Sequence, residues 1–204
     1  MQQPIDINSV EYNTKKKIFT AAARLFAERG YNAVSMREIA EQSGLSKPMI
    51  YYYFGSKEGI YRELAETGVS HLFSALDEVI VMPITAGEKL TLIMKKFFHA
   101  CVLFPEFTKF FSNLACSAEK TDFLKNFKVM AGRKEQTIVG LFREGIESGE
   151  FDKSLQPEIA AHVFMGIFMH FIMQQFAKKE RILSEELAEN LAGILLYGIK
   201  NKAN

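Results

Sequence analysis

The sequence predicts an all-α fold of about nine helices. Only 13 Gly and 5 Pro interrupt the 204 residues, which is few for a protein built from many short strands. Apolar residues instead recur at intervals of three and four along most of the chain, as they do on one face of an α-helix. Hydrophobic residues make up 48% of the chain, so such helices can bury a substantial core.

The N-terminal region begins with one helix that starts near Thr14 and ends before Gly30. Ile18, Ala22 and Leu25 have helical spacing, and a glycine directly after the last periodic residue is typical of a helix C-terminus. The first helix is therefore expected to run to about residue 29.

Two short helices follow, with a turn of about three residues between them. Ser35 and Glu38 have the spacing of a capping box, which predicts a helix from 36 to about 43, ending at Gly44. Ser46 is the expected N-cap of the next helix, and Pro48 lies in its first turn, where a missing N–H group costs nothing.

A fourth, longer helix begins after Gly55, with Ser56 as its N-cap, and continues to about residue 81. The segment 82–87 then breaks the pattern. Helical spacing returns in five further segments, which are expected at 88–104, 106–118, 122–148, 157–178 and 184–200.

The segment between Glu158 and Lys178 contains no charged residue and is long enough to cross a membrane. It also contains His162 and His170, which favour a helix packed within protein over a membrane span. The N-terminus lacks the order of a signal peptide. Two cysteines do not make a disulfide framework, so a cytoplasmic location is expected.

Charge is distributed unevenly although the net charge is only +1. Residues 1–62 contain nine Lys or Arg and six Asp or Glu, whereas the remainder contains 16 and 18. A mildly basic N-terminal region suggests contact with nucleic acid, but three charges are weak evidence alone.

The two short helices form the stronger signal, because a capped helix, a glycine-containing turn and a second short helix constitute a helix-turn-helix. In the second helix, Ile50 and Phe54 are four residues apart and are expected to pack into a three-helix core. Lysine and tyrosine side chains on the other face suit phosphate oxygens, and Pro48 and Met49 suit thymine methyl groups.

Residues 14–62 resemble the DNA-binding domain of the tetracycline-repressor (TetR) family of bacterial transcriptional regulators. The resemblance rests on the segments AAARLFAERGY at 21–31, SMREIA at 35–40, GLSK at 44–47 and IYYYFGSKE at 50–58. It implies a helix-turn-helix domain in residues 1–56 and a helical effector-binding and dimerisation domain in residues 57–204. The resemblance also implies that the residues in contact with DNA are Ser35, Arg37, Lys47, Pro48, Met49, Tyr51, Tyr52, Tyr53 and Lys57.

Tyr53 departs from the family pattern, since many members carry His at this position. A phenol keeps a hydrogen-bonding tip but loses the possible positive charge. The alternative is that the tyrosines form a half-buried packing face. Likewise, the run of Lys15, Lys16 and Lys17 is either a flank for the DNA backbone or a solvated surface.

Fourteen of the 18 Phe residues lie between Phe97 and Phe176. Large apolar side chains of this kind line small-molecule pockets, although every helical domain also needs them for core packing. The family resemblance implies an effector pocket in this region. The residues expected to line it are Phe97, Cys101, Phe104, Phe107, Phe110, Phe111, Met165 and Met169.

The last two helices are expected to form a homodimer interface, because the penultimate helix is apolar nearly all round. The predicted interface residues are Phe164, Phe168, Phe171, Leu187, Leu191, Ile194, Leu195 and Gly198. A dimer with recognition helices about 34 Å apart meets successive major grooves on one face of DNA, which predicts a near-palindromic operator.

The sequence therefore predicts a homodimeric regulator, a repressor that a small apolar or aromatic effector releases from its operator. An enzyme is disfavoured because His99 and Cys101 are two residues apart on a helix and point in nearly opposite directions. No cofactor and no metal site are expected, since His162 and His170 are eight residues apart and out of alignment. A constitutive architectural DNA-binding protein with a filled core remains the other alternative.

Overall fold

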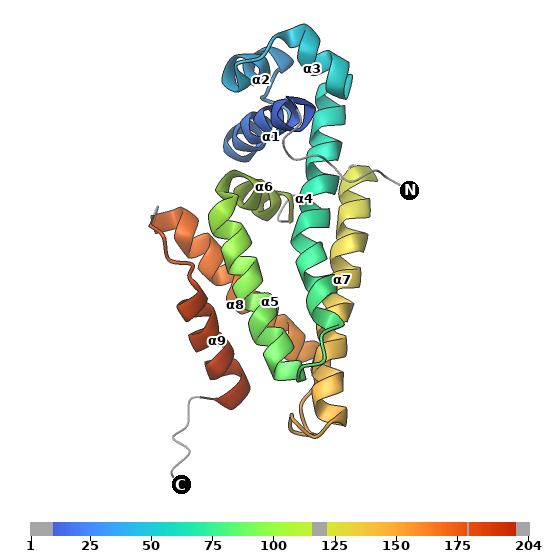
Figure 1. Ribbon diagram of the computed structural model, residues 1–204, viewed down its shortest axis with the longest axis vertical. Helices are drawn as coiled ribbons and strands as arrows, with labels where there is room; N and C mark the ends of the chain where they lie inside the picture. The colour runs from blue at the N-terminus through green and yellow to red at the C-terminus, as the bar shows by residue number, and fades with distance from the viewer. Residues whose placement is uncertain (1–9, 116–121, 179, 199–204) are drawn as a thin grey trace. The chain divides into compact units, whose positions relative to one another are not determined.

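The computed structural model describes residues 10–115, 122–178 and 180–198. Nine α-helices occur in this part of the chain (Figure 1). They are α1 (Val10–Arg29), α2 (Met36–Ser43), α3 (Lys47–Phe54), α4 (Lys57–Ile80), α5 (Ala86–Leu103), α6 (Pro105–Ala115), α7 (Asp122–Glu147), α8 (Pro157–Lys178) and α9 (Glu185–Tyr197). The all-α prediction is confirmed.

Two helix starts differ from the expected ones. The first helix begins at Val10 rather than near Thr14, whose hydroxyl donates back to the Val10 carbonyl at 2.7 Å inside the helix. The fifth begins at Ala86, because Thr85 and Glu88 form a second capping box. That pair has the same three-residue spacing as Ser35 and Glu38.

The chain divides into two compact units. The first unit comprises Met1–Val69 and Pro105–Leu124, and the second comprises Ser70–Phe104 and Lys125–Asn204. This division does not follow the boundary expected at residue 56, because the start of α4 and the whole of α6 pack with the N-terminal helices. A functional boundary at residue 56 therefore stays a prediction.

In the first unit, α6 lies against α1 (Figure 1). The Asn113 amide donates to the Ala27 carbonyl at 2.8 Å, and Arg24 forms an ion pair with Glu106 at 3.0 Å. The Phe110 ring contacts Phe26 at a centroid distance of 6.3 Å. A helix that is about 80 residues away in the sequence thus completes the core around α1.

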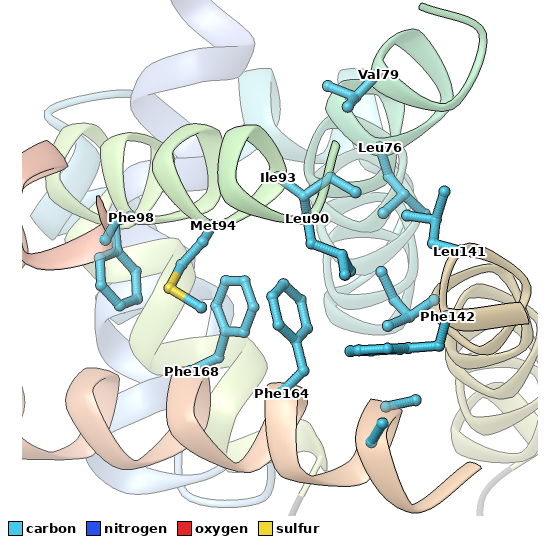
Figure 2. Packing of buried hydrophobic residues seen from close by; sticks show 14 of the residues in the cluster. Leu76, Val79, Leu90, Ile93, Met94, Phe98, Leu141, Phe142, Phe164 and Phe168 are labelled. Atoms are coloured by element: carbon cyan, nitrogen blue, oxygen red, sulfur yellow. The ribbon is translucent and has the colours of Figure 1, made fainter. Parts of the chain in front are cut away.

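The core of the second unit is built by α5, α7, α8 and α9 with the end of α4. Figure 2 shows Phe164 and Phe168 of α8 directed toward Leu90 and Met94 of α5. The Phe164 and Phe168 rings lie 4.8 Å apart in an edge-to-face arrangement, which is a favoured geometry for aromatic pairs. Edge-to-face phenyl rings are therefore part of this core.

One face of α8 is buried and the other is exposed. The buried residues are Ala160, Ala161, Phe164, Phe168 and Ile172. Among the described helices, α8 alone is long and apolar enough to cross a bilayer by length and composition, a test that core helices of other proteins also pass. Its buried face matches the expectation that this segment packs within protein.

Candidate nucleic-acid interface and apolar unit

The helix-turn-helix is held by side-chain caps at both of its helix starts. The Ser35 amide donates to the Glu38 carboxylate at 2.8 Å, while the Glu38 amide donates to the Ser35 hydroxyl at 3.3 Å. Gly44 then adopts a left-handed conformation at φ 69°, which residues with a Cβ rarely adopt, and ends α2. Ser46 caps α3 by accepting from the Met49 amide. These local bonds fix where the two helices meet.

The two faces of α3 have separate roles. Ile50 is fully buried and Phe54 is 8% exposed, with its ring 5.2 Å from that of Phe19 on α1. On the opposite face, Tyr52 is 83% exposed and Tyr51 is 44% exposed. The buried pair anchors the helix, so the outward tyrosines present hydroxyl groups on a rigid support, as direct contact with DNA requires.

The first residues of α3 are also exposed, including Lys47, Pro48 and Met49. The Lys47 ammonium lies 5.8 Å from the centroid of the Tyr51 ring. Together with the tyrosines they form one continuous surface of a cation, hydroxyl groups and small apolar edges. This composition matches the donors and apolar contacts that read base edges in a major groove.

Tyr53 is only half exposed and packs more than its neighbours do. Its ring lies 5.2 Å from that of Tyr52, and the Lys15 ammonium lies 6.0 Å from its centroid. Tyr53 therefore fits the alternative of a half-buried packing face in part, whereas Tyr51 and Tyr52 face outward. The DNA contacts assigned to all three stay predictions.

At the start of α2, Arg37 is exposed over 79% of its side chain and forms an ion pair with Glu41 at 3.2 Å. Such an exposed pair is weak, so the guanidinium can exchange it for a phosphate or a guanine edge. The Ser35 hydroxyl, by contrast, donates to Glu38 at 2.7 Å. Hydrogen bonds from Ser35 first, and then from Arg29, lower the pKa of Glu38 to about 2.

Lys57 is engaged inside the first unit. Its ammonium donates to the carbonyls of Tyr31 at 2.9 Å and Val34 at 2.8 Å, and lies 4.2 Å from the centroid of the Tyr31 ring. Two of its three N–H donors are used to hold the loop between α1 and α2. The expected phosphate contact stays a prediction that would have to use the third. No sequence signal indicated this clamp.

The residues expected to line an effector pocket fall into both compact units. Phe107, Phe110 and Phe111 belong to the first unit, and the Phe110 ring packs edge-to-face on Tyr61 at 5.3 Å. The others belong to the second unit. There Cys101 is fully buried, Phe97 packs at 4.9 Å from Phe168, and the exposed residues are Phe104, Met165 and Met169. Their shared role as a lining stays a prediction.

The expected dimer residues also separate into two groups. Phe164 is fully buried and Phe168 is 8% exposed, so both belong to the core of the second unit rather than to its surface. The reason is the phase of α8, which turns these rings toward α5 and α7. Phe171, Leu187, Leu191 and Leu195 are half-buried, whereas Ile194 and Gly198 are exposed.

The exposed side of α8 carries an apolar row that differs from the expected interface residues. The row consists of Ile159, Val163, Met165, Met169 and Met173, which are 38% to 55% exposed. An apolar row on one helix is characteristic of a surface that another protein covers. Periodicity alone did not distinguish this row from the phenylalanine row, because α8 is apolar nearly all round.

His99 and Cys101 are not placed to act together as a base and a thiol. Cys101 is fully buried, whereas His99 is exposed on another side of α5. Across the described ranges, no group of three or more His, Cys, Asp or Glu side chains is placed to hold a metal ion.

Comparison with known proteins gives a match that is centred on the helix-turn-helix. Residues 18–64 match the family described as bacterial regulatory proteins, tetR family. Over 192 residues, the chain is 27% identical to the fatty acid metabolism regulator protein of Bacillus subtilis, covering 91% of this chain and 95% of that protein.

Two further similarities extend over nearly the whole chain. The HTH-type transcriptional repressor KstR2 of Mycolicibacterium smegmatis is 24% identical over 203 residues, covering 95% of this chain and 94% of the repressor. The crystal structure of FadR from Bacillus subtilis in complex with stearoyl-CoA has a TM-score of 0.75 at 24% identity. It covers 91% of this chain and 99% of that one, and shows that the fold is shared.

Proposed function

Because the chain belongs to the tetR family of bacterial transcriptional regulators, we propose that it is a homodimeric repressor that an apolar effector releases from a near-palindromic operator. The protein is a regulator that binds DNA through its helix-turn-helix, and it is not an enzyme. The dimeric state, the direction of regulation and the effector are the parts that we propose. Such a protein acts on chromosomal operators and so works in the cytoplasm.

The observation that carries the proposal is the anchored and outward-facing surface of α3. Ile50 and Phe54 lock the helix into the core, and Tyr51, Tyr52 and Met49 face away from it. Repression, rather than activation, is supported by the similarity to the KstR2 repressor, which spans nearly the full length of both proteins.

A second copy of the chain is the proposed occupant of the exposed apolar row on α8. Val163, Met169 and Met173 would otherwise remain in contact with water, and Ile194 on α9 is 50% exposed. A two-fold interface is self-complementary, so one such row covers the same row of the partner. A dimer also supplies the two recognition helices that a palindrome requires.

The proposed effector is a long-chain acyl-CoA or a compound with a similar apolar chain. The similarity to a fatty acid metabolism regulator and to a fold solved with stearoyl-CoA supports this chemistry. Phe97, Phe171 and Phe176 are partly buried against the core of the second unit and would give such a chain apolar surface. To lower operator affinity tenfold, the effector must prefer the released state by about 1.4 kcal/mol.

Genome-fragment selection at a fixed salt concentration, followed by fluorescence anisotropy on the recovered site, tests the proposal. We expect a near-palindrome and release of DNA by stearoyl-CoA, but not by free CoA, which lacks the acyl chain. Binding without sequence preference would favour the architectural alternative. Operator binding that no acyl-CoA changes would overturn the effector while leaving the DNA-binding assignment intact.

A further inference from the structure

The first unit contains a concave surface separate from the exposed face of α3. It lies between α1 and the last turn of α2 and has a volume of about 410 Å³. Its polar lining consists mainly of Asn13, Lys16, Lys17, Arg24, Gln42 and Ser43. We refer to these residues as the α1/α2 groove. Three of the six carry positive charge, and none carries negative charge.

The three consecutive lysines of α1 differ in how their charges are balanced. Lys15 forms ion pairs with Glu11 and Glu63, each at 3.6 Å. Lys16 and Lys17 form no ion pair with any other described residue. The reason lies in the helical spacing, since Glu11 is four residues before Lys15 and no acid has that relation to the other two lysines.

The charge of the groove is therefore concentrated at one end. Arg24 is partly neutralised by Glu106, whose carboxylate lies 3.0 Å from the guanidinium. Lys16 and Lys17 have no acidic partner among the described residues and are joined there by the neutral side chains of Asn13 and Gln42. Uncompensated ammonium groups beside amides favour an anion with several acceptor oxygens, and a phosphate fits that description.

The position of the groove indicates where such a phosphate comes from. Gln42 and Ser43 end α2, and α3 begins only four residues after Ser43. The opposite side of α1 supports α3 directly through Phe19 and Phe54. The groove thus belongs to the same packed group of helices, α1 to α3, as the exposed tyrosines. Because the groove is open to solvent and lies near α3, it suits a phosphate of the DNA backbone better than a small ligand that needs an enclosed pocket.

We propose that the α1/α2 groove binds a backbone phosphate of DNA through Lys16 and Lys17, beside the bases that α3 contacts. A phosphate contact does not depend on the DNA sequence. It therefore adds affinity and fixes the orientation of the helix-turn-helix on DNA without reading bases. The inference deepens the proposed function, because it presupposes that the helix-turn-helix binds DNA.

The test compares the salt dependence of DNA binding for three proteins by fluorescence anisotropy. Lys16→Ala/Lys17→Ala is expected to reduce the slope of log affinity against log salt by about one for each lysine that contacts phosphate. If both do, the ratio of the affinities of wild type and variant changes about tenfold between 50 and 200 mM salt. Lys15→Ala is the matched control and should keep the slope of the wild type.

A neutral methylphosphonate placed at one linkage at a time then locates the contact. We expect one linkage at which the substitution weakens the wild type but not the double variant. Glu106→Gln should have the opposite effect and steepen the slope of log affinity against log salt. The substitution removes the carboxylate that pairs with Arg24, so the Arg24 guanidinium becomes available to the phosphate. Thermal unfolding of each variant checks that the exposed substitutions leave the fold intact.

An unchanged slope in the double variant would overturn the inference, as would an equal loss in Lys15→Ala, which would indicate a general charge effect. The measurement is repeated on duplex DNA of arbitrary sequence. Because phosphate contacts are independent of sequence, the difference in slope should persist there. If no operator is found, the result counts against the proposed repressor alone. If wild type and double variant have the same slope, the result counts against the phosphate site in the groove alone.

Discussion

The two compact units are both helical and both bury an apolar core, but they differ in the surfaces that they expose. In the first unit, rings such as Phe26 and Phe110 pack in the core, and the Lys57 clamp holds the loop between α1 and α2. In the second unit, the rings of Phe164 and Phe168 lie in the core. The first unit exposes tyrosines and cations on α3, whereas the second exposes an apolar row on α8. The polar surface suits a charged polymer that is bound reversibly, and the apolar row suits a protein partner.

The largest effect should come from opening the phenyl core of the second unit. Phe164→Ala removes a fully buried ring, and we expect a loss of about 3–5 kcal/mol in the free energy of unfolding, measured by urea titration. Met169→Ala on the same helix is the control. Its side chain is 39% exposed in one chain, so its loss should be smaller and, if a second copy covers this row, should vary with protein concentration. Equal losses would mean that the two faces of α8 are not distinct.

A smaller effect should follow from removing the polar clamp of the first unit. Lys57→Met leaves the carbonyls of Tyr31 and Val34 without their charged donor, and we expect a loss of about 1–3 kcal/mol in urea titration. Lys47→Met, at an exposed position of α3, should leave stability unchanged.

The same Lys57→Met variant also separates a clamp from a phosphate contact. If Lys57 acts through the loop between α1 and α2, the salt slope of DNA binding should stay that of the wild type. A slope reduced by about one, with no loss of stability, would assign Lys57 to the DNA backbone instead.

Glycine substitutions should have opposite signs in the two units. Gly44→Ala places a Cβ at φ 69°, which should cost about 1–2 kcal/mol. Gly140→Ala lies inside α7 with no atom within 4 Å of the new Cβ, so it should add about 0.5–1 kcal/mol. Thermal and urea unfolding of both variants measures the difference. A neutral Gly44→Ala would show that the turn is not tightly constrained.

The smallest effect is a dependence on pH within the capping box. The folded-state pKa of Glu38 is lowered to about 2 from an ordinary value of 4.5. The carboxylate therefore contributes stability that is present above pH 4.5 and is lost as the pH falls toward 2. Unfolding measured between pH 2 and 5 should lose part of its pH dependence in Glu38→Gln. Identical pH profiles for the two proteins would contradict the lowered pKa.

Much of the first unit was predictable because its signals are local. The caps at Ser35 and Ser46 involve partners three residues away, so they are readable without knowledge of the rest of the chain. The burial of Ile50 and Phe54 followed from their four-residue spacing and is confirmed. The family resemblance predicted the role of the α3 surface. It did not predict the Lys57 clamp, because Lys57 is 26 positions from Tyr31 and 23 positions from Val34.

The sequence by itself determined the helices, most of their ends and the helix-turn-helix, since hydrogen bonds between near neighbours decide them. Only the tertiary structure decided that α6 packs with the N-terminal helices, and that Phe164 faces inward while Met169 faces outward. Both side chains are apolar and lie on a helix that is apolar nearly all round. Which of them is buried depends on contacts with α5 and α7, and those contacts join segments far apart in the chain.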